Sequence, residues 1–130
     1  MKFPSKELIE KMTSLGFRIE RIGEAKDFST WGYIFEKEQK SENDVIVVSS
    51  ATRIVEFLEK VLEKGRGDVL RGIKNVSIWY WAGNRFRGCG SDSSSITIEK
   101  EIAKKIKLKG NFRWIDRGWG DFSAELEYEL

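Results

Sequence analysis

The feature that most constrains the fold is an apolar stripe in the middle of the chain. Its members recur at positions i, i+3, i+4, i+7 and i+8, and they are Ile54, Phe57, Leu58, Val61 and Leu62. This spacing places them on one face of an α-helix, which is stable when another layer of structure covers that face. Ser49 or Ser50 provides the N-cap, and Gly65 stands where a C-terminal glycine belongs. A second layer must therefore pack against this helix.

The segments around this helix have the alternating pattern of β-strands. We expect strands at 17–22, 31–37, 45–48, 76–81, 85–89, 112–116 and 122–130. In the strand 76–81, Val76, Ile78 and Tyr80 share one face, which leaves Trp79 and Trp81 on the other. The run 45–48 is apolar on both faces, and such a run is typical of a central strand.

Two further helices are predicted from spacing and capping. The first begins after Ser5, presents Leu8 and Met12 on one face, and ends at Gly16. The other covers 98–108, with acidic residues in its first turn and lysines in its last. A single helical turn is expected to begin at Asp68.

The resulting order is α-β-β-β-α-β-β-α-β-β. It predicts the α+β class, with a mostly antiparallel sheet and about three helices packed on one face. We expect residues 1–130 to form one domain, because the length is typical of one and Pro4 is the sole proline.

Composition narrows the chemistry. The chain has no histidine and one cysteine, Cys89, so it can form neither a Cys/His zinc site nor an internal disulfide bond. It also lacks the usual general base near neutral pH. This favours a binding protein over an enzyme, without a metal or cofactor.

The sequence also bears on where the protein works. It shows neither an apolar leader nor a run of about 20 apolar residues, and we therefore expect a cytoplasmic protein with no membrane contact. Abundant Lys and Glu with a single Gln suggest a thermophilic source.

The charges divide the chain into unequal parts. Residues 65–117 carry 12 basic and 5 acidic side chains, whereas residues 118–130 carry 4 acidic and no basic ones. In the basic part arginines alternate with aromatic residues, which suits phosphate contacts combined with base stacking. The predicted ligand-binding residues are Trp79, Trp81, Arg85, Arg87, Arg113, Trp114 and Arg117.

Several other interpretations remain open. The sheet aromatics could simply pack in the core. The loop 88–95, placed before a helix, could bind a phosphate. Cys89 could be a nucleophile, and the pairs Asp116/Asp121 and Asp68/Asp92 could bind a divalent ion. The alternating glutamates of 125–129 could form a solvated face, protect a sheet edge or dock onto a basic partner.

We therefore expect a small non-enzymatic protein that binds a phosphate-bearing ligand, nucleic acid or nucleotide, through a basic and aromatic surface in residues 76–119. The first alternative is a protein-interaction factor, an inhibitor or adaptor, that uses the same tryptophans and arginines. The second is a metal-dependent nuclease or nucleotide hydrolase.

Overall fold

The fold is described from a computed structural model, which covers residues 2–23, 30–81, 94–110, 113–115, 119–121 and 126–130. For residues 30, 81, 113–115 and 119–121 it describes the backbone alone. In chain order the elements are α1 (Lys6–Ser14), β1 (Arg18–Ile22), β2 (Thr30–Glu36), β3 (Asp44–Ser49), α2 (Ala51–Glu63), α3 (Gly67–Arg71), β4 (Ile73–Trp81), β5 (Ser94–Glu99), α4 (Lys100–Lys105), β6 (Arg113–Ile115) and β7 (Trp119–Asp121).

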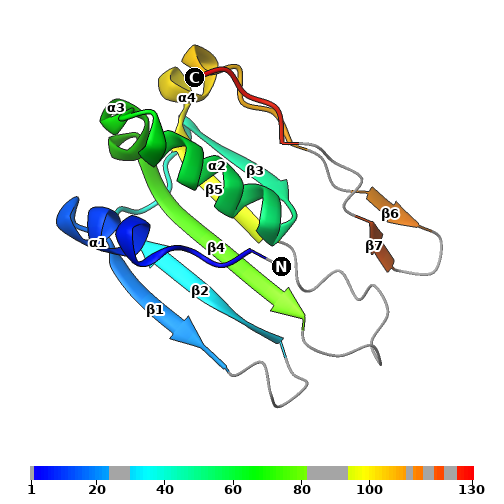
Figure 1. Cartoon of the computed structure of the whole chain (residues 1–130). Coiled ribbons are helices and arrows are strands. Elements are labelled where there is room, and N and C mark those ends of the chain that lie inside the picture. The colour runs from blue at the N-terminus through cyan, green and yellow to red at the C-terminus, as the bar shows by residue number, and fades with distance from the viewer. Residues whose placement is uncertain (1, 24–29, 82–93, 111–112, 116–118, 122–125) are drawn as a thin grey trace.

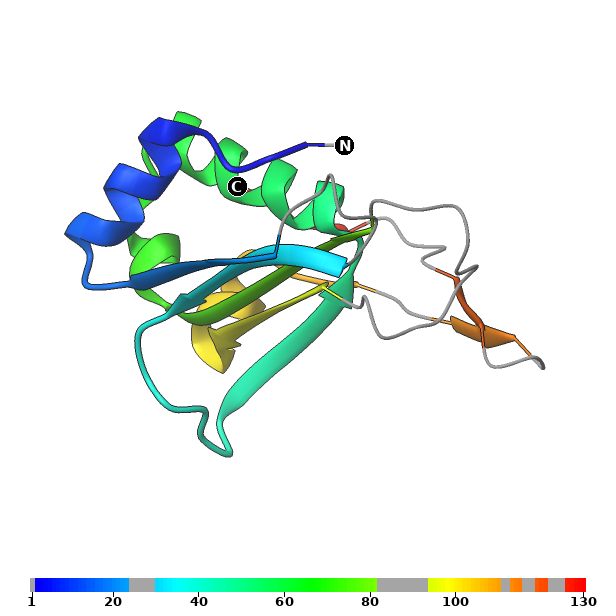
Figure 2. The same ribbon diagram turned by 90° about the horizontal axis from the view of Figure 1, so that it is seen from below.

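Five strands form one antiparallel sheet in the order β1-β2-β4-β5-β3, and β6 pairs with β7 in a separate hairpin. Helices α1 and α2 lie side by side on one face of the sheet (Figure 1). The opposite face is crossed by the connection between β2 and β3 instead (Figure 2). The predicted α+β class and order of elements are confirmed, with α3 as the short helix expected at Asp68.

The core lies between the helices and the sheet. Four members of the stripe that predicted α2 are fully inaccessible to solvent, and the fifth, Leu62, is half-buried; the four are Ile54, Phe57, Leu58 and Val61. The sheet covers it with Val76, Ile78 and Tyr80 of β4, Ile96 and Ile98 of β5, and Phe35 of β2. The predicted inward face of the β4 strand is therefore confirmed.

Both predicted serine caps are present, and one of them joins the two long helices. Ser5 Oγ accepts the backbone N–H of Leu8 at 3.1 Å, and Ser50 Oγ accepts that of Arg53 at 3.2 Å. Ser5 also donates its own backbone N–H and its hydroxyl to the carboxylate of Glu59, both at 3.0 Å. The start of α1 is thereby attached to α2.

Aromatic rings on the helix-side face hold β2, β4 and the N-terminal segment together. The ring centroids of Trp31 and Tyr80 are 4.8 Å apart, and Phe3 lies 5.1 Å from the first and 4.9 Å from the second. Tyr80 donates its hydroxyl to the carbonyl of Lys2. Burial, with a smaller contribution from Tyr33, raises the pKa of the Tyr80 phenol. This packing supports the pairing of β2 with β4 from the helix side of the sheet.

The prediction that 45–48 is a central strand is wrong. β3 is an edge strand, bonded on one side to β5. Val47 faces the helices and is buried, but Ile46 points to the helix-free face and is 51% exposed. The apolar run therefore reflects an apolar patch on the open face rather than burial on both sides.

The helix predicted over 98–108 is shorter and begins later. Residues Ser94–Glu99 form β5, and α4 covers Lys100–Lys105. Ile98 pairs with Ile73 of β4 and Val45 of β3, so sheet pairing overrides the helical spacing of the isoleucines. Residues 88–93 of the predicted phosphate-binding loop lie outside the described residues, and a strand, not a helix, follows them, so no helix N-terminus begins there.

The C-terminal strand prediction is also corrected. β7 covers Trp119–Asp121, between the predicted strands 112–116 and 122–130, and of the second strand the structure describes residues 126–130. These residues form one isolated β-bridge, between Lys109 and Glu127, and the backbone N–H of Glu129 donates to Ile106 O at 2.7 Å. The alternation itself survives, because Leu126 is buried whereas Glu127 and Glu129 are exposed. The ring of Tyr128 packs edge-on against Phe57 at 4.9 Å. The predicted strand 85–89 lies outside the described residues.

Candidate functional site

The helix-free face of the sheet is made by alternate residues of its five strands. The strand register arranges these residues in rows that cross the sheet. The first row is Arg18, Glu36, Asn75, Thr97 and Ile46, and the second is Glu20, Ile34, Ser77, Ser95 and Val48. A third row contains Ile22, Gly32 and Trp79. Polar residues therefore occupy the middle of this face, and the first two rows end in charged residues on β1 and in apolar residues on β3.

Trp79 is held in place on this face. Its indole Nε1–H donates to Ser77 Oγ at 2.7 Å, and its backbone N–H donates to Ser94 Oγ at 2.9 Å. Its six-membered ring passes over Gly32 of β2, where a Cβ atom would lie 3.1 Å from Trp79 Cε3. The ring is half-buried, so part of its surface is open to a ligand.

A hollow with a volume of about 640 Å³ lies beside Ser77 on the same face. Its floor is formed by Ile34, Ser77, Ser95, Asn75 and Thr97, of which Thr97 is 1% exposed. This volume is in the range of pockets that hold small molecules.

The wall of the hollow is the start of the β2–β3 connection, residues 37–40. Asn75 Nδ2 donates to the carbonyl of Glu38 at 2.8 Å, and the backbone N–H of Lys37 donates to Lys74 O at 2.9 Å. The amine of Lys37 turns away to Arg71 O, at 3.2 Å. The connection is therefore tied to β4.

The far end of the same connection is fastened by Asp44. The backbone N–H of Ser41 donates to Asp44 Oδ2 at 2.6 Å, and Lys74 Nζ lies 3.1 Å from Oδ1. The Ser41 N–H, with Lys74 adding to it, lowers the pKa of the Asp44 carboxyl. The first end of the connection is thus hydrogen-bonded to β4, and the second end is held by Asp44, which is itself paired with Lys74 of β4.

The cations around the hollow differ in their surroundings. Arg18 Nη2 pairs with Glu36 Oε2 at 2.8 Å, and the Arg18 side chain is 78% exposed. Lys40 is exposed at the rim. Glu36 and Glu38 balance these two cations, so the rim has local positive centres but little net charge.

The structure describes some of the predicted ligand-binding residues fully, some by their backbone alone and others not at all. Trp79 lies on the helix-free face, as predicted. Trp81 is the last residue of β4, and Arg113 and Trp114 lie in β6, but their side chains are outside the described part. Arg85, Arg87 and Arg117 fall entirely outside it. The prediction that Trp79 lies on the face opposite Val76, Ile78 and Tyr80 is confirmed.

The hollow was missed in the sequence. Its floor combines Asn75 and Ser77 of β4 with Ser95 and Thr97 of β5, and the latter two were assigned to a loop and its boundary. The alternation of Asn75, Ser77 and Trp79 opposite an apolar face was visible, and it could have pointed to a polar sheet face. Only the partner strand and its register complete the site.

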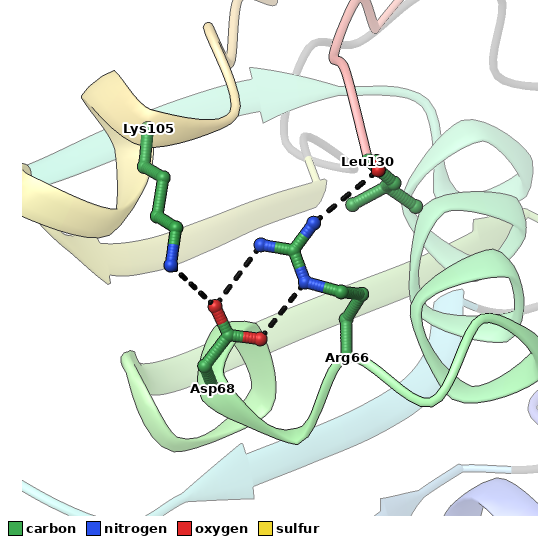
Figure 3. A network of polar contacts seen from close by, with 4 residues as sticks. All are labelled: Arg66, Asp68, Lys105 and Leu130. Carbon is green, nitrogen blue, oxygen red and sulfur yellow. Dashed lines mark hydrogen bonds and ion pairs between the residues drawn. The ribbon is translucent and has the colours of Figure 1, made fainter.

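The carboxylate of Asp68, which the sequence offers as a possible metal ligand, is already paired with two cationic side chains (Figure 3). Arg66 Nε and Nη2 donate to the two oxygens of Asp68 at 2.9 and 3.0 Å, and Lys105 Nζ lies 3.0 Å from Oδ2. Arg66 Nη1 also reaches Leu130 O at 3.3 Å. Within the described residues no group of three potential ligands could hold a metal ion. Cys89, Asp92 and Asp116 lie outside them, and Asp121 is described by its backbone alone.

The Asp68 network makes stability depend on acid. Arg66, followed by Lys105, holds the Asp68 pKa well below its ordinary value. The network therefore stabilises the fold fully above about pH 4, the usual aspartate range, and less as the pH falls further. We expect the difference in unfolding free energy between the wild type and Asp68→Asn to narrow steadily below about pH 4, as measured by urea unfolding. A difference independent of pH would contradict this account.

Each helix in the described part of the chain is too short or too polar to cross a membrane. When the chain is compared with known proteins, no family model, curated protein or solved structure matches it.

Proposed function

We propose that this protein is a non-enzymatic binding protein for a phosphate-bearing ligand, a nucleotide or nucleic acid, and that the ligand lies on the helix-free face of the sheet. The observation that carries the proposal is the half-buried indole of Trp79, held by Ser77 and Gly32 next to a polar hollow. A fixed aromatic ring beside hydroxyl groups suits a base attached to a sugar phosphate, because every base can stack on it.

The exposed amine of Lys40 at the rim would contact phosphate. A lysine that contacts a phosphate makes binding weaker as salt increases, because ions screen the attraction between the two charges. For a nucleoside 5′-monophosphate, we expect Lys40→Ala to weaken binding and to make the slope of log affinity against log salt shallower. Calorimetric titrations at several salt concentrations measure both values.

Lys64→Ala is the matched control, because Lys64 is also an exposed lysine and lies at the end of α2, in the helix layer. It should leave affinity and slope unchanged. Binding that does not weaken as salt increases would remove the phosphate part of the proposal.

A protein-interaction factor is the second candidate, and Ile46 is the observation that favours it. Its side chain is 51% exposed, and Val48 and Ile34 lie on the same face. If this candidate is correct, a stoichiometric protein partner should remain bound after nuclease treatment, and Ile46→Glu should release it. Nucleotide binding unaffected by Ile46→Glu would instead support the first candidate.

A further inference from the structure

The hollow has a floor of four polar side chains in a rectangular arrangement. Ser77 stands directly opposite Ser95, and Asn75 directly opposite Thr97. Facing Cβ atoms in an antiparallel pair are about 5 Å apart, and alternate residues along a strand are about 7 Å apart. The patch is therefore of the size of a single sugar ring.

These four side chains can both donate and accept hydrogen bonds. Ser77 Oγ accepts the Trp79 indole N–H, and it still carries its own proton to donate. Asn75 uses one amide N–H on Glu38 O and keeps its carbonyl oxygen as an acceptor. The half-buried Ser95 adds one further donor and acceptor, whereas Thr97 is 1% exposed and closes the bottom of the floor. Such a floor matches neighbouring hydroxyls, each of which also donates and accepts.

The order of groups along β4 matches the order of parts in one nucleotide. Trp79, Ser77 and Asn75 follow one another at alternate positions on the same face, with the β2–β3 connection and Lys40 beyond Asn75. A base stacked on Trp79 would place its sugar over the polar floor and its phosphate at the rim. The connection, tied to β4 by Asn75 and Lys74, stands in the path of a longer strand.

The charges at the rim limit the number of phosphates. Arg18 is already paired with Glu36, and Glu38 stands beside Lys40 in the chain. A single phosphate can use Lys40 and the remaining N–H groups of Arg18. Each additional phosphate would bring negative charge towards the two glutamates, which costs binding energy.

From this arrangement, and resting on the proposed function, we infer that the ligand is a single ribonucleoside monophosphate, with its ribose over Ser77, Ser95, Asn75 and Thr97. The hollow therefore discriminates ribose from deoxyribose and one phosphate from three. Trp79 provides affinity for the base, and the polar floor provides selectivity for the sugar.

The test compares ribonucleoside and deoxyribonucleoside 5′-monophosphates of the same base by calorimetry. A hydrogen bond to the 2′-hydroxyl predicts that the wild type prefers the ribose form by about 3- to 10-fold. The variant Ser95→Ala should bring the ratio close to 1, with little change in affinity for the deoxyribose form. Circular dichroism checks that the variant is folded. Ser14→Ala, an exposed serine on α1, is the matched control and should keep the wild-type ratio.

A second measurement tests the rim. The wild type should bind the monophosphate more tightly than the triphosphate of the same ribonucleoside in the absence of divalent ions, and Glu38→Gln should reduce this difference. Equal affinity for both sugars in the wild type, or a ratio that Ser95→Ala leaves unchanged, would overturn the inference but leave the proposed function standing. If no nucleotide or oligonucleotide binds at all, both fail together.

Discussion

Replacing Trp79 with alanine should lower the affinity of the protein for a nucleotide by about 5- to 150-fold. This range corresponds to the roughly 1–3 kcal/mol that one base gains by stacking on an aromatic side chain. The loss should be similar for ribose and deoxyribose ligands, because in the proposed binding mode Trp79 contacts the base rather than the sugar. Calorimetric titration of both ligands measures it.

Two comparisons make this result specific. Trp79→Phe retains an aromatic face and should recover a large part of the affinity. Phe3→Ala removes an exposed aromatic ring on the helix side of the sheet, and it should leave binding unchanged. If Trp79→Ala binds as tightly as the wild type, the helix-free face is not the binding surface.

Replacing Gly32 with alanine should destabilise the protein by about 3 kcal/mol or more. Glycine within a strand normally costs stability, so this exchange would be favourable at an ordinary strand position. At Gly32, however, the new Cβ would lie 1.9 Å from the carbonyl oxygen of Ile78. Backbone atoms cannot move aside as a flexible side chain can, and crowding of this kind typically costs about 1–3 kcal/mol or more. Urea unfolding measures the change.

Gly67→Ala is the control for this substitution. The Cβ added there meets the terminal nitrogen of Arg71 at 3.3 Å, and a flexible side chain of this kind can shift. Its unfolding free energy should therefore remain close to that of the wild type. A Gly32→Ala variant as stable as Gly67→Ala would show that β2 and β4 are not in such close contact.

The elements predicted correctly are those whose evidence is local. α2 is specified by five apolar residues in one stripe and a serine cap, and the two faces of β4 follow from strict alternation. The errors arise where distant pairing decides. Ile98 has helical spacing to Ile102, yet its neighbours are Ile73 and Val45, which are far away in the sequence. Likewise, a run that is apolar on both faces, such as 45–48, does not show whether its strand is central or at an edge, because the number of neighbouring strands depends on the rest of the chain.

The candidate site was predicted in part for the same reason. Trp79 could be assigned to the outer face from the alternation of its own strand. The hydroxyls beside it come from β5, which joins β4 and β3 through a register that no local pattern encodes. Lys40 reaches the site because Asn75 holds the neighbouring carbonyl of Glu38. A long-range contact of this kind has no signature in the sequence around either residue.

The strand order β1-β2-β4-β5-β3 has a consequence for how the protein folds. β3 follows β2 directly in the sequence, but its partner strand β5 begins at Ser94, after α2, α3 and β4. The pairing of Asp44 with Glu99 must therefore close a long loop, and such pairings form late and slowly. The β2–β3 connection, which forms the wall of the hollow, reaches its final position when β3 pairs with β5. We therefore expect the hollow in the completed fold and not in partly folded chains. A ligand bound in the hollow would therefore stabilise the state in which the edge strand β3 is paired with β5.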